Sequence, residues 1–320
     1  MRVLAYLHTF NDADVIERAI AGLQRQTRPP DAILIVDNAS SDDTLARNFP
    51  EGVSVIRNSS NLGTAGAIEV GFKYALERDF DWMWILDPDG NLTKTALEKI
   101  LSLYESFPSS QQASTGFIAC LPLAEPEGTP LHGRLFTPHG RFPAITTAKQ
   151  DYYACHTTIW AGSLYRLAAV RKVGLPNPDY FIDRDDLSFN YHLMKAGYTG
   201  YIHQRAEIRQ HISLFSASKR LTFGPLSFTV YEMPPLRCYY TVRNTLYFTI
   251  YDQSDGFLAK MRELWRLRSR PDRGMMSGVA WQSAFFTLNF ALRARSHVPQ
   301  IKACLRGIWH GITGNIAARY

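Results

Sequence analysis

Two carboxylates flank a proline in the segment Asp87-Pro88-Asp89, which directly follows the apolar run from Trp82 to Leu86. In an extended chain, residues two apart project to the same side, so both carboxylates can face one ligand. Proline fits such a segment because it fixes its own φ and cannot continue a strand ladder. Carboxylate oxygens suit a hard divalent cation that also binds phosphate. The same pattern occurs in solvated surface turns, so the surrounding elements must decide between the two.

Four short apolar runs alternate with helical patterns over the first hundred residues. They cover residues 3–7, 32–36, 53–56 and 82–86. Strands that are apolar on both faces and alternate with helices predict a parallel sheet covered by helices on both sides, an α/β fold. We expect Asp12 or Asp14 to cap the first helix, and Thr64–Glu77 to form the next one. Because ligands bind at the carboxyl ends of such strands, four polar loops should converge on one edge.

The loop after the third run, residues 61–66 (NLGTAG), opens a predicted helix with small residues. Small residues let a ligand approach the backbone closely, and a helix N-terminus favours an anion. Only Gly63 and Gly66 are suitably spaced for a dinucleotide-binding motif, and no phosphate-binding P-loop is present. The alternative is that these glycines only allow the helix to pack tightly on the sheet.

A second acidic cluster, Asp183-Arg184-Asp185-Asp186, precedes a helical pattern that ends near Lys195. If the helix begins within this cluster, Asp183 and Asp186 lie on one face, whereas Asp185 points elsewhere. Acidic residues at a helix start often serve only as caps. An ionised carboxylate can also accept a proton from an alcohol that attacks another molecule, as a general base does.

The pattern weakens between residues 104 and 149, which predicts irregular loops and short strands such as Gly116–Leu121. Beyond it, Leu164–Val173 is expected to be a helix, and Ala206–His211 a short strand or turn. The chain after Pro235 is expected to be mainly helical.

The net charge of +6 is concentrated in the last part of the chain. Up to Val230, 22 Lys and Arg residues face 24 Asp and Glu residues, whereas from Tyr231 onward 13 face 5. This basic tail also contains large apolar residues. Such a tail fits either an amphipathic helix pair at an anionic membrane surface or plain helix packing. Nucleic acid is not an expected partner.

Composition bounds the class of protein. With 320 residues, 46% of them hydrophobic and 20% charged, the chain has the make-up of a globular enzyme. Its four cysteines lie far apart without a CxxC motif, so a zinc site or disulfide framework is not indicated. The sequence contains no run of about 18 apolar residues, so it does not predict a membrane-spanning helix. The short apolar start does not match a signal peptide, so we expect a cytoplasmic protein, peripheral at the membrane if the tail binds it.

Taken together, these segments resemble the inverting glycosyltransferases of family 2, which have the GT-A fold. The resemblance rests on the order and spacing of motifs over roughly residues 1–215, and it is strongest to the rhamnosyltransferase and galactofuranosyltransferase branch. Members of that branch also carry a tail segment like residues 237–244 (RCYYTVRN). The matching motifs are residues 7–11 (LHTFN), 36–44 (VDNASSDDT), 61–66 (NLGTAG), 86–90 (LDPDG), 160–164 (WAGSL) and 181–186 (FIDRDD).

The resemblance implies a role for each matching residue, on the donor side first. The residues that would bind the nucleotide and its sugar are Thr9, Asn11 and Asp37 for the base, Asn61 and Gly63 for the ribose and diphosphate, and Asp87 for the ribose or donor sugar.

The resemblance also implies a metal site and an acceptor side. Asp89 and His211 would hold Mn²⁺ or Mg²⁺, and Asp186 would be the general base. Trp160, Asp183 and Asp185 are candidates for the acceptor side; Trp160 can stack on a sugar ring, although an aromatic residue there also fits core packing.

The sequence therefore predicts a GT-A (Rossmann-like) nucleotide-sugar-binding domain over residues 1–230, followed by a basic, mainly helical C-terminal extension over 231–320. Within the domain, the nucleotide-binding half covers about residues 1–103 and the acceptor half about 104–230.

The resemblance implies an enzyme that transfers a sugar from a nucleotide-diphosphate donor, of UDP-galactofuranose or dTDP-rhamnose type, to a hydroxyl of a glycan or lipid-linked acceptor. Transfer would proceed with inversion, in cell-envelope polysaccharide synthesis. The alternatives are a hydrolase that uses two carboxylates and a non-catalytic scaffold of the same fold that binds nucleotide sugars or a membrane surface. The sequence leaves the oligomeric state open.

Overall fold

The computed structural model describes residues 1–46, 49–137, 140–144, 150–211, 218–223, 226–231, 233–253 and 298–320. The chain divides into two compact units. The first contains residues 1–137, 141–178 and 189–211, and the second contains residues 138–140, 179–188 and 212–320.

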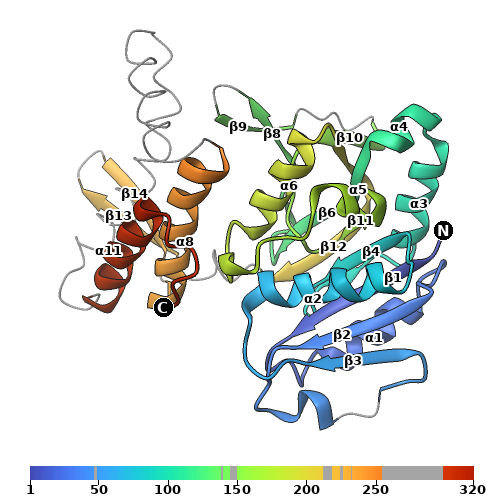
Figure 1. Ribbon diagram of the computed structural model, residues 1–320, viewed down its shortest axis with the longest axis horizontal. Helices are drawn as coiled ribbons and strands as arrows, with labels where there is room; N and C mark the ends of the chain where they lie inside the picture. Colours follow the sequence, from blue (N-terminus) through green and yellow to red (C-terminus); the bar gives the residue numbers. More distant parts are fainter. Residues whose placement is uncertain are drawn as a thin grey trace. The chain divides into compact units, whose positions relative to one another are not determined.

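The first unit is built on one mixed sheet, whose described strands run in the order β10-β12-β6-β11-β4-β1-β2-β3 (Figure 1). In addition, β5 pairs with β12 and β7 pairs with β6, while β8 and β9 form a separate pair. The strands are β1 (Val3–Thr9), β2 (Ala32–Asp37), β3 (Val53–Arg57), β4 (Trp82–Leu86), β5 (Asn91–Leu92), β6 (Thr115–Glu125), β7 (Thr129–Pro130), β8 (Arg134–Thr137), β9 (Gly140–Pro143), β10 (Tyr152–Cys155), β11 (Ser163–Arg166) and β12 (Thr199–His211).

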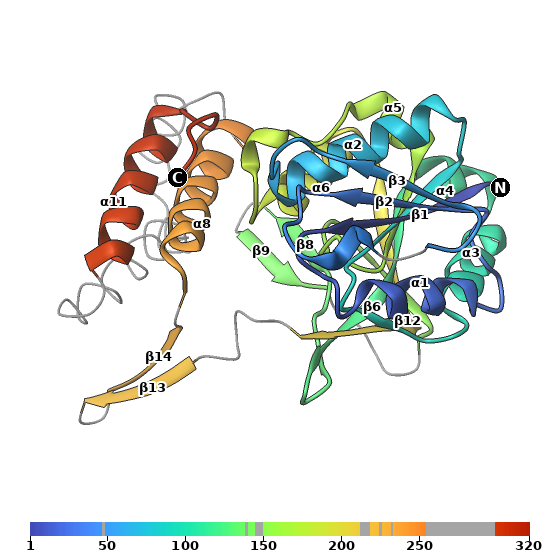
Figure 2. The same ribbon diagram turned by 90° about the horizontal axis from the view of Figure 1, so that it is seen from below.

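Helices cover both faces of this sheet. In Figure 2, α2 and α5 lie on one face, and α1 and α3 lie on the other. The part of α6 from Phe189 onward packs on the same face as α2 and α5. The helices are α1 (Ile16–Gln24), α2 (Gly63–Glu77), α3 (Ala96–Ser106), α4 (Ser109–Ser114), α5 (Leu167–Val173) and α6 (Asp185–Lys195), with short 3₁₀ turns at Asp43–Ala46 (η1) and Pro178–Tyr180 (η2).

The predicted parallel sheet is confirmed for β1 to β4. β1 lies between β2 and β4, and both pairings are parallel, as is the pairing of β2 with β3. Every residue of β4 is buried, as expected for a strand that has helices on both sides. β11 is antiparallel to both of its neighbours, β4 and β6, so the sheet is mixed beyond the four predicted strands.

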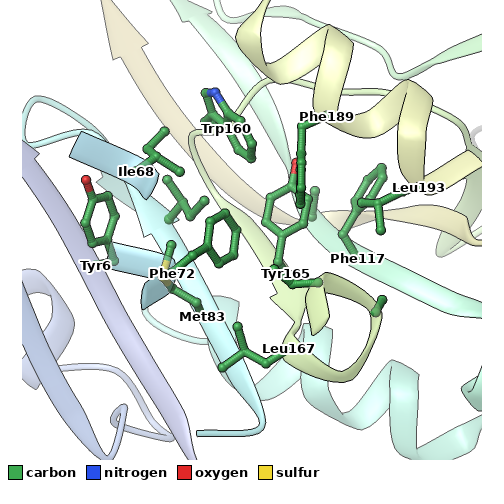
Figure 3. Close-up of a cluster of buried hydrophobic side chains, with 14 of the residues drawn as sticks. Tyr6, Ile68, Phe72, Met83, Phe117, Trp160, Tyr165, Leu167, Phe189 and Leu193 are labelled. Atoms are coloured by element: carbon green, nitrogen blue, oxygen red, sulfur yellow. The ribbon is translucent and has the colours of Figure 1, made fainter. Parts of the chain in front are cut away.

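Alternate residues of these strands feed two hydrophobic cores, one on each face. Tyr6, Met83 and Phe117 belong to the core under α2 and α5, whereas Leu7, Trp84 and Ile118 belong to the core under α1 and α3. Figure 3 shows the first core, in which the rings of Phe72, Tyr165 and Phe189 pack against one another. The period-two alternation of strand side chains therefore supplies both cores.

Two local predictions were wrong, and one helix was missed. The predicted helix over Leu164–Val173 begins only at Leu167, because Ser163–Arg166 forms β11 between β4 and β6. The helix α3 was not predicted, because its apolar face borders a region with weak periodicity. Neither Asp12 nor Asp14 caps α1 through its side chain; Asp12 instead accepts hydrogen bonds from Thr9 Oγ1 and from the amide of Phe10.

In the described part of the second unit, two long helices pack against each other. They are α8 (Pro235–Tyr247), continued by a π-helical segment η3 (Phe248–Asp252), and α11 (Val298–Thr313); the strands β13 (Ser218–Phe223) and β14 (Leu226–Tyr231) form a hairpin. A Cβ atom at Gly307 would lie 2.7 Å from the carbonyl oxygen of Tyr239, so glycine permits this close approach of α11 to α8. None of the described helices combines the length and apolar character that crossing a membrane requires.

The packing of α2 on the sheet generates a stability prediction. A Cβ atom at Gly71 would lie 2.3 Å from Cε2 of the fully buried Tyr6, so Gly71→Ala requires the helix or the ring to shift. We expect Gly71→Ala to lower the free energy of unfolding by roughly 1–3 kcal/mol, measured by urea denaturation.

Gly22 in α1 is the matched control, because a Cβ atom there meets nothing within 4 Å. Gly22→Ala should raise the free energy of unfolding by roughly 0.5–1 kcal/mol through helix propensity alone. Equal stabilities of the two variants would contradict the described contact between α2 and β1.

Candidate active site

The loops that follow β1 and β2 are joined by hydrogen bonds at the carboxyl edge of the sheet. The amide of Asn38 donates to the carbonyl of Thr9 at 2.8 Å, and the amide of Asn58 donates to the carbonyl of Asp37 at 2.8 Å. Asn11 has a φ of +60°, and its amide donates to Ser40 Oγ at 2.9 Å. The predicted convergence of these polar loops is therefore confirmed for the first three strands.

Side chains of the predicted nucleotide-binding residues stabilise these loops. Asn11 Oδ1 accepts from the amide of Ser41 at 2.8 Å. Asp37 is fully buried; its carboxylate accepts from the amide of Ser40 at 3.1 Å and lies 3.6 Å from Arg57 Nε. The structure thus brings Thr9, Asn11 and Asp37 together at the ends of β1 and β2.

Asn38, which the sequence did not single out, ties the start of α2 to this edge. Its Nδ2 donates to the carbonyl of Gly63 at 3.0 Å, and its Oδ1 accepts from Asn58 Nδ2 at 2.9 Å and from the amide of Leu62 at 3.4 Å. Asn61 Oδ1 in turn accepts from the amide of Gly63 at 2.8 Å. Gly63 has a φ of +72°, which glycine adopts without strain.

The segment after β4 is a turn, so the prediction of an extended Asp87-Pro88-Asp89 was wrong. The amide of Gly90 donates to the carbonyl of Asp87 at 3.0 Å, which closes a four-residue turn with Pro88 at its second position. Proline favours that position because its φ is already set for it. Asp87 and Asp89 therefore belong to one turn rather than to one face of a strand.

His8 is a second residue whose role the sequence analysis missed. Its Nε2 lies 3.7 Å from Asp87 Oδ1, and its buried Nδ1 has no hydrogen-bond partner within the described structure. Burial raises the pKa of the Asp87 carboxyl; His8 opposes this rise and Asp12 adds to it. The sequence could have indicated this role, because His8 is the second-last residue of β1 and the polar loop begins just after it.

The turn after β4 is also close to the end of β12. β5 pairs with β12 in an antiparallel register that sets Asn91 opposite Arg209. Asp89 and His211 each lie two residues along the chain from this pair, beyond the end of the printed register. A Cβ atom at Gly90 would lie 2.8 Å from Ile208 Cδ1, so the turn and β12 are in contact. The side chain of His211 lies outside the described part of the structure.

The divalent cation that the sequence implies requires suitable ligands among these residues. In the described ranges, no group of three or more His, Cys, Asp and Glu side chains is arranged to hold a metal by itself. A hard cation that binds together with substrate phosphates needs only one or two carboxylates from the protein. The turn containing Asp87 and Asp89 supplies them, and His8 Nδ1 is a further polar atom with no hydrogen-bond partner among the described residues. The donor set therefore fits Mg²⁺ or Mn²⁺ bound jointly with a phosphate ligand.

Trp160 lies in the hydrophobic core. Its side chain is 5% exposed, and its ring centre lies 5.2 Å from that of Tyr165 and 5.5 Å from that of Phe189 (Figure 3). These contacts favour the packing alternative over stacking on a sugar.

The acidic cluster of Asp183, Asp185 and Asp186 belongs to the second unit. Its three carboxylates differ in burial and in hydrogen-bond partners. Asp183 precedes α6, which begins at Asp185, so the predicted shared helix face of Asp183 and Asp186 was wrong. Asp183 accepts from Arg237 Nη2 at 3.0 Å and from Thr241 Oγ1 at 2.6 Å. Asp185 is buried, whereas Asp186 is half-buried and accepts from the amide of Leu187 at 2.6 Å.

The comparisons with known proteins agree with this arrangement. The model of the family described as "Glycosyl transferase family 2" matches residues 6–174, which include the end of β1, all of β2 to β4 and the loops after these four strands. The chain belongs to glycosyl transferase family 2. The galactofuranosyltransferase GlfT1 of Mycobacterium tuberculosis is 25% identical over 202 residues, which cover 61% of this chain and 65% of that protein. The chain thus spans less than two thirds of the length of this curated relative.

Solved structures show the fold. TarS of Staphylococcus aureus, in complex with UDP-GlcNAc, superposes with a TM-score of 0.57 at 15% identity, over 99% of this chain and 83% of that chain. A mannosyltransferase of Pyrobaculum calidifontis, in complex with GDP-Man and Mn²⁺, has a TM-score of 0.54 at 12% identity, over 97% of this chain and 86% of that chain. The expected GT-A fold is therefore confirmed.

The site geometry generates a prediction for Asn38, which is 3% exposed and makes three hydrogen bonds between the loops. Asn38→Ala removes the hydrogen bonds from its side chain to Gly63, Asn58 and Leu62. We expect the free energy of unfolding to fall by roughly 2 kcal/mol, measured by urea denaturation.

The variant Asn38→Asp serves as a graded control, because it keeps an acceptor for Asn58 and Leu62 but loses the donor to Gly63. Its free energy of unfolding should lie between those of the wild type and Asn38→Ala. If all three proteins are equally stable, Asn38 does not tie the loops together.

Proposed function

We propose that this protein transfers a sugar from a nucleotide-diphosphate donor to a hydroxyl group of a glycan or lipid-linked acceptor, with inversion at the anomeric carbon. The observation that carries the proposal is the convergence of the loops after β1, β2 and β3 on one edge of a family 2 sheet. A donor of UDP-galactofuranose type and a role in cell-envelope polysaccharide synthesis are proposed from the likeness to a galactofuranosyltransferase. A donor of dTDP-rhamnose type is the alternative.

The donor would bind across the loops at this edge. Thr9, Asn11 and Asp37 would hold the nucleotide base, because their loops are already joined through Ser40 and Asn38. The α2 start at Asn61 and Gly63 offers backbone amides and a helix N-terminus to the diphosphate. A bound divalent cation, Mn²⁺ or Mg²⁺, would supply positive charge that offsets the charge developing on the leaving diphosphate.

The turn after β4 would complete the donor side. Asp87 would contact the ribose or the donor sugar, with His8 orienting its carboxylate from 3.7 Å away. Asp89 and His211 would hold the cation; the pairing of Asn91 with Arg209, two residues from each of them along the chain, supports this assignment. Carboxylate and imidazole ligands suit Mn²⁺ or Mg²⁺ when waters and phosphate oxygens complete the coordination.

Asp186 would be the general base. As the acceptor oxygen forms a bond to the anomeric carbon, its proton passes to the Asp186 carboxylate, and the bond to the nucleoside diphosphate breaks on the opposite face. Among the three candidate acids, Asp183 is already engaged by Arg237 and Thr241, and Asp185 is buried. These settings favour Asp186 for proton transfer and Asp183 and Asp185 for structural support on the acceptor side.

The decisive experiment compares donor binding with turnover. In a transfer assay with nucleotide sugars and Mn²⁺, we expect chelation by EDTA to abolish transfer and the product to have the inverted anomeric configuration. Asp186→Asn should lower kcat by ~10²-fold with unchanged donor affinity, because a carboxamide cannot accept the proton. Asp89→Asn should instead weaken metal-dependent donor binding, measured by calorimetry.

Asp14→Asn is the matched control, since the same chemical change is made at an exposed residue outside residues 87–89 and 183–186. It should leave kcat and donor affinity unchanged. Undiminished activity in EDTA would exclude the metal assignment. A dead Asp183→Asn or Asp185→Asn enzyme beside an active Asp186→Asn enzyme would show that the base was misplaced.

We further propose that α11 contacts an anionic membrane surface, which would make the protein cytoplasmic and peripheral at the membrane. Leu305, Trp309 and Ile312 recur at helical spacing on its outer face and are 54%, 67% and 36% exposed. Lys302 flanks this stripe, and no acidic residue occurs in α11. An apolar stripe with Trp and a basic flank fits the interface of an anionic bilayer. The basic residues between 254 and 297 lie outside the described part of the chain.

Vesicle co-sedimentation at low salt tests this surface. The wild type should bind vesicles of phosphatidylglycerol and phosphatidylcholine. Lys302→Glu should weaken binding by about thirtyfold, since a charge worth ~1 kcal/mol is here reversed and the change is ~2 kcal/mol. Trp309→Ala should also weaken binding, because it removes the large apolar side chain of the stripe. Lys195→Glu in α6 makes the same charge change elsewhere and should bind like the wild type. Background binding of the wild type would leave α11 as a packing or oligomer surface.

A further inference from the structure

The chain just before Asp186 adopts an unusual backbone conformation. Phe181, Asp183 and Arg184 have φ angles of +64°, +66° and +68°. Residues other than glycine rarely adopt this left-handed backbone conformation, and they keep it only where surrounding contacts hold them. Residues 179–186, here called the acidic segment, therefore need partners that fix their backbone.

Asn244 of α8 binds the backbone of the acidic segment directly. Its Nδ2 donates to the carbonyls of Tyr180, Ile182 and Asp183 at 2.9, 2.8 and 2.7 Å. Asn244 is fully buried, so no water replaces these bonds. One side-chain amide thus holds three carbonyls within a span of four residues.

The adjacent Arg243 extends this support. Its guanidinium is fully buried; Nη2 donates to the carbonyls of Asp179 and Tyr180 at 2.7 and 3.0 Å. Nη1 donates to the carbonyls of Ile316 and Ala318, and Nε donates to Asn244 Oδ1 at 2.8 Å. Every nitrogen of the guanidinium is thereby bonded, which a buried cation requires. The last bond also fixes the amide orientation of Asn244.

Side chains of the acidic segment are held by the same helix. Arg237 donates to both carboxylate oxygens of Asp183, from Nη2 at 3.0 Å and from Nε at 3.3 Å, and Thr241 Oγ1 donates at 2.6 Å. Arg184 Nε donates to Thr245 Oγ1 at 3.1 Å. Residues 237, 241, 244 and 245 recur at helical spacing, so one face of α8 serves the whole segment.

We propose that Asn244, with Arg243, Arg237 and Thr241, positions the Asp186 carboxylate for proton transfer by fixing the backbone of the acidic segment. These α8 residues are positioning residues, because they act through the segment and not on the substrate. The inference rests on the proposed function, since it needs Asp186 to be the base. It assigns to the Arg-Asn pair in the tail a role in the transfer reaction itself.

The magnitude follows from how sharply general-base catalysis depends on geometry. A base must lie within hydrogen-bond reach of the proton, and a displacement of about 1 Å costs ~10²-fold in rate. Loosening the segment therefore lowers kcat, whereas the loops that would bind the donor after β1, β2 and β3 make none of these contacts. A split between kcat and donor affinity distinguishes positioning from a general loss of structure.

The experiment uses the full chain with Asn244→Ala, Thr241→Val and Thr241→Ser. For each we measure kcat, donor affinity by calorimetry, and hydrogen exchange of peptides that cover residues 179–188. Asn244→Ala should lower kcat by ~10²-fold, and Thr241→Val by about tenfold for one charge-assisted hydrogen bond. In both variants exchange of the acidic segment should become faster while donor affinity stays unchanged. Thr241→Ser keeps the hydroxyl and should restore both kcat and protection.

Thr313→Val is the matched control, because its hydroxyl bonds only locally to the carbonyls of Trp309 and His310 in α11. It should match the wild type in all three measurements. If Asn244→Ala fails to fold, the Thr241 pair still decides the matter, since Thr241→Val is nearly isosteric.

The outcomes separate this inference from the proposed function. Faster exchange of the acidic segment with wild-type kcat in Asn244→Ala and Thr241→Val, while Asp186→Asn is inactive, would overturn the inference and leave the function intact. An equal loss of donor affinity and kcat in Thr241→Val would also overturn it. No transfer by the wild type, or full turnover by Asp186→Asn, would overturn the proposed function itself.

Discussion

The arrangement of the first unit depends on one constraint: β1, β2 and β4 are covered by helices on both faces and can carry almost no polar side chains. Polar residues are thereby confined to the strand ends, where loops leave the sheet. Parallel pairing then brings the ends of β1, β2 and β3 to one edge, and hydrogen bonds from Asn38 and to Ser40 join the loops there. The position of the candidate site is thus a consequence of core burial.

A different constraint shapes the second unit, which buries the charged guanidinium of Arg243. Taking such a group out of water is costly unless all its donors are satisfied. Here backbone carbonyls of residues 179, 180, 316 and 318 satisfy it, so two segments far apart in the sequence meet at α8. The same helix packs closely on α11 at Gly307. The tail is therefore tied to the acidic segment by hydrogen bonds and not only by apolar contact.

The acidic residues Asp183 and Asp87 differ in the interactions that they make within the protein. Asp183 forms an ion pair with Arg237 and accepts from Thr241, so its charge is committed to structure. Asp87 lies 3.7 Å from His8, and burial raises the pKa of its carboxyl, to which Asp12 adds; a carboxyl in such surroundings gains from a cationic or hydrogen-bonding ligand. This contrast supports a ligand at the turn after β4 and a structural role for Asp183.

The sequence alone determined the order of the four strands up to residue 86 and of the two helices between them, their parallel pairing and the family, because apolar runs and loop motifs are local and regular. It did not predict that residues 163–166 form a strand between β4 and β6, since pairing with distant strands decides this. The turn at Asp87 to Gly90 and the roles of His8 and Asn38 depend on contacts across loops. The role of Asp183 was decided by α8, more than 50 residues away, because a carboxylate's role follows from the partners that the fold brings to it.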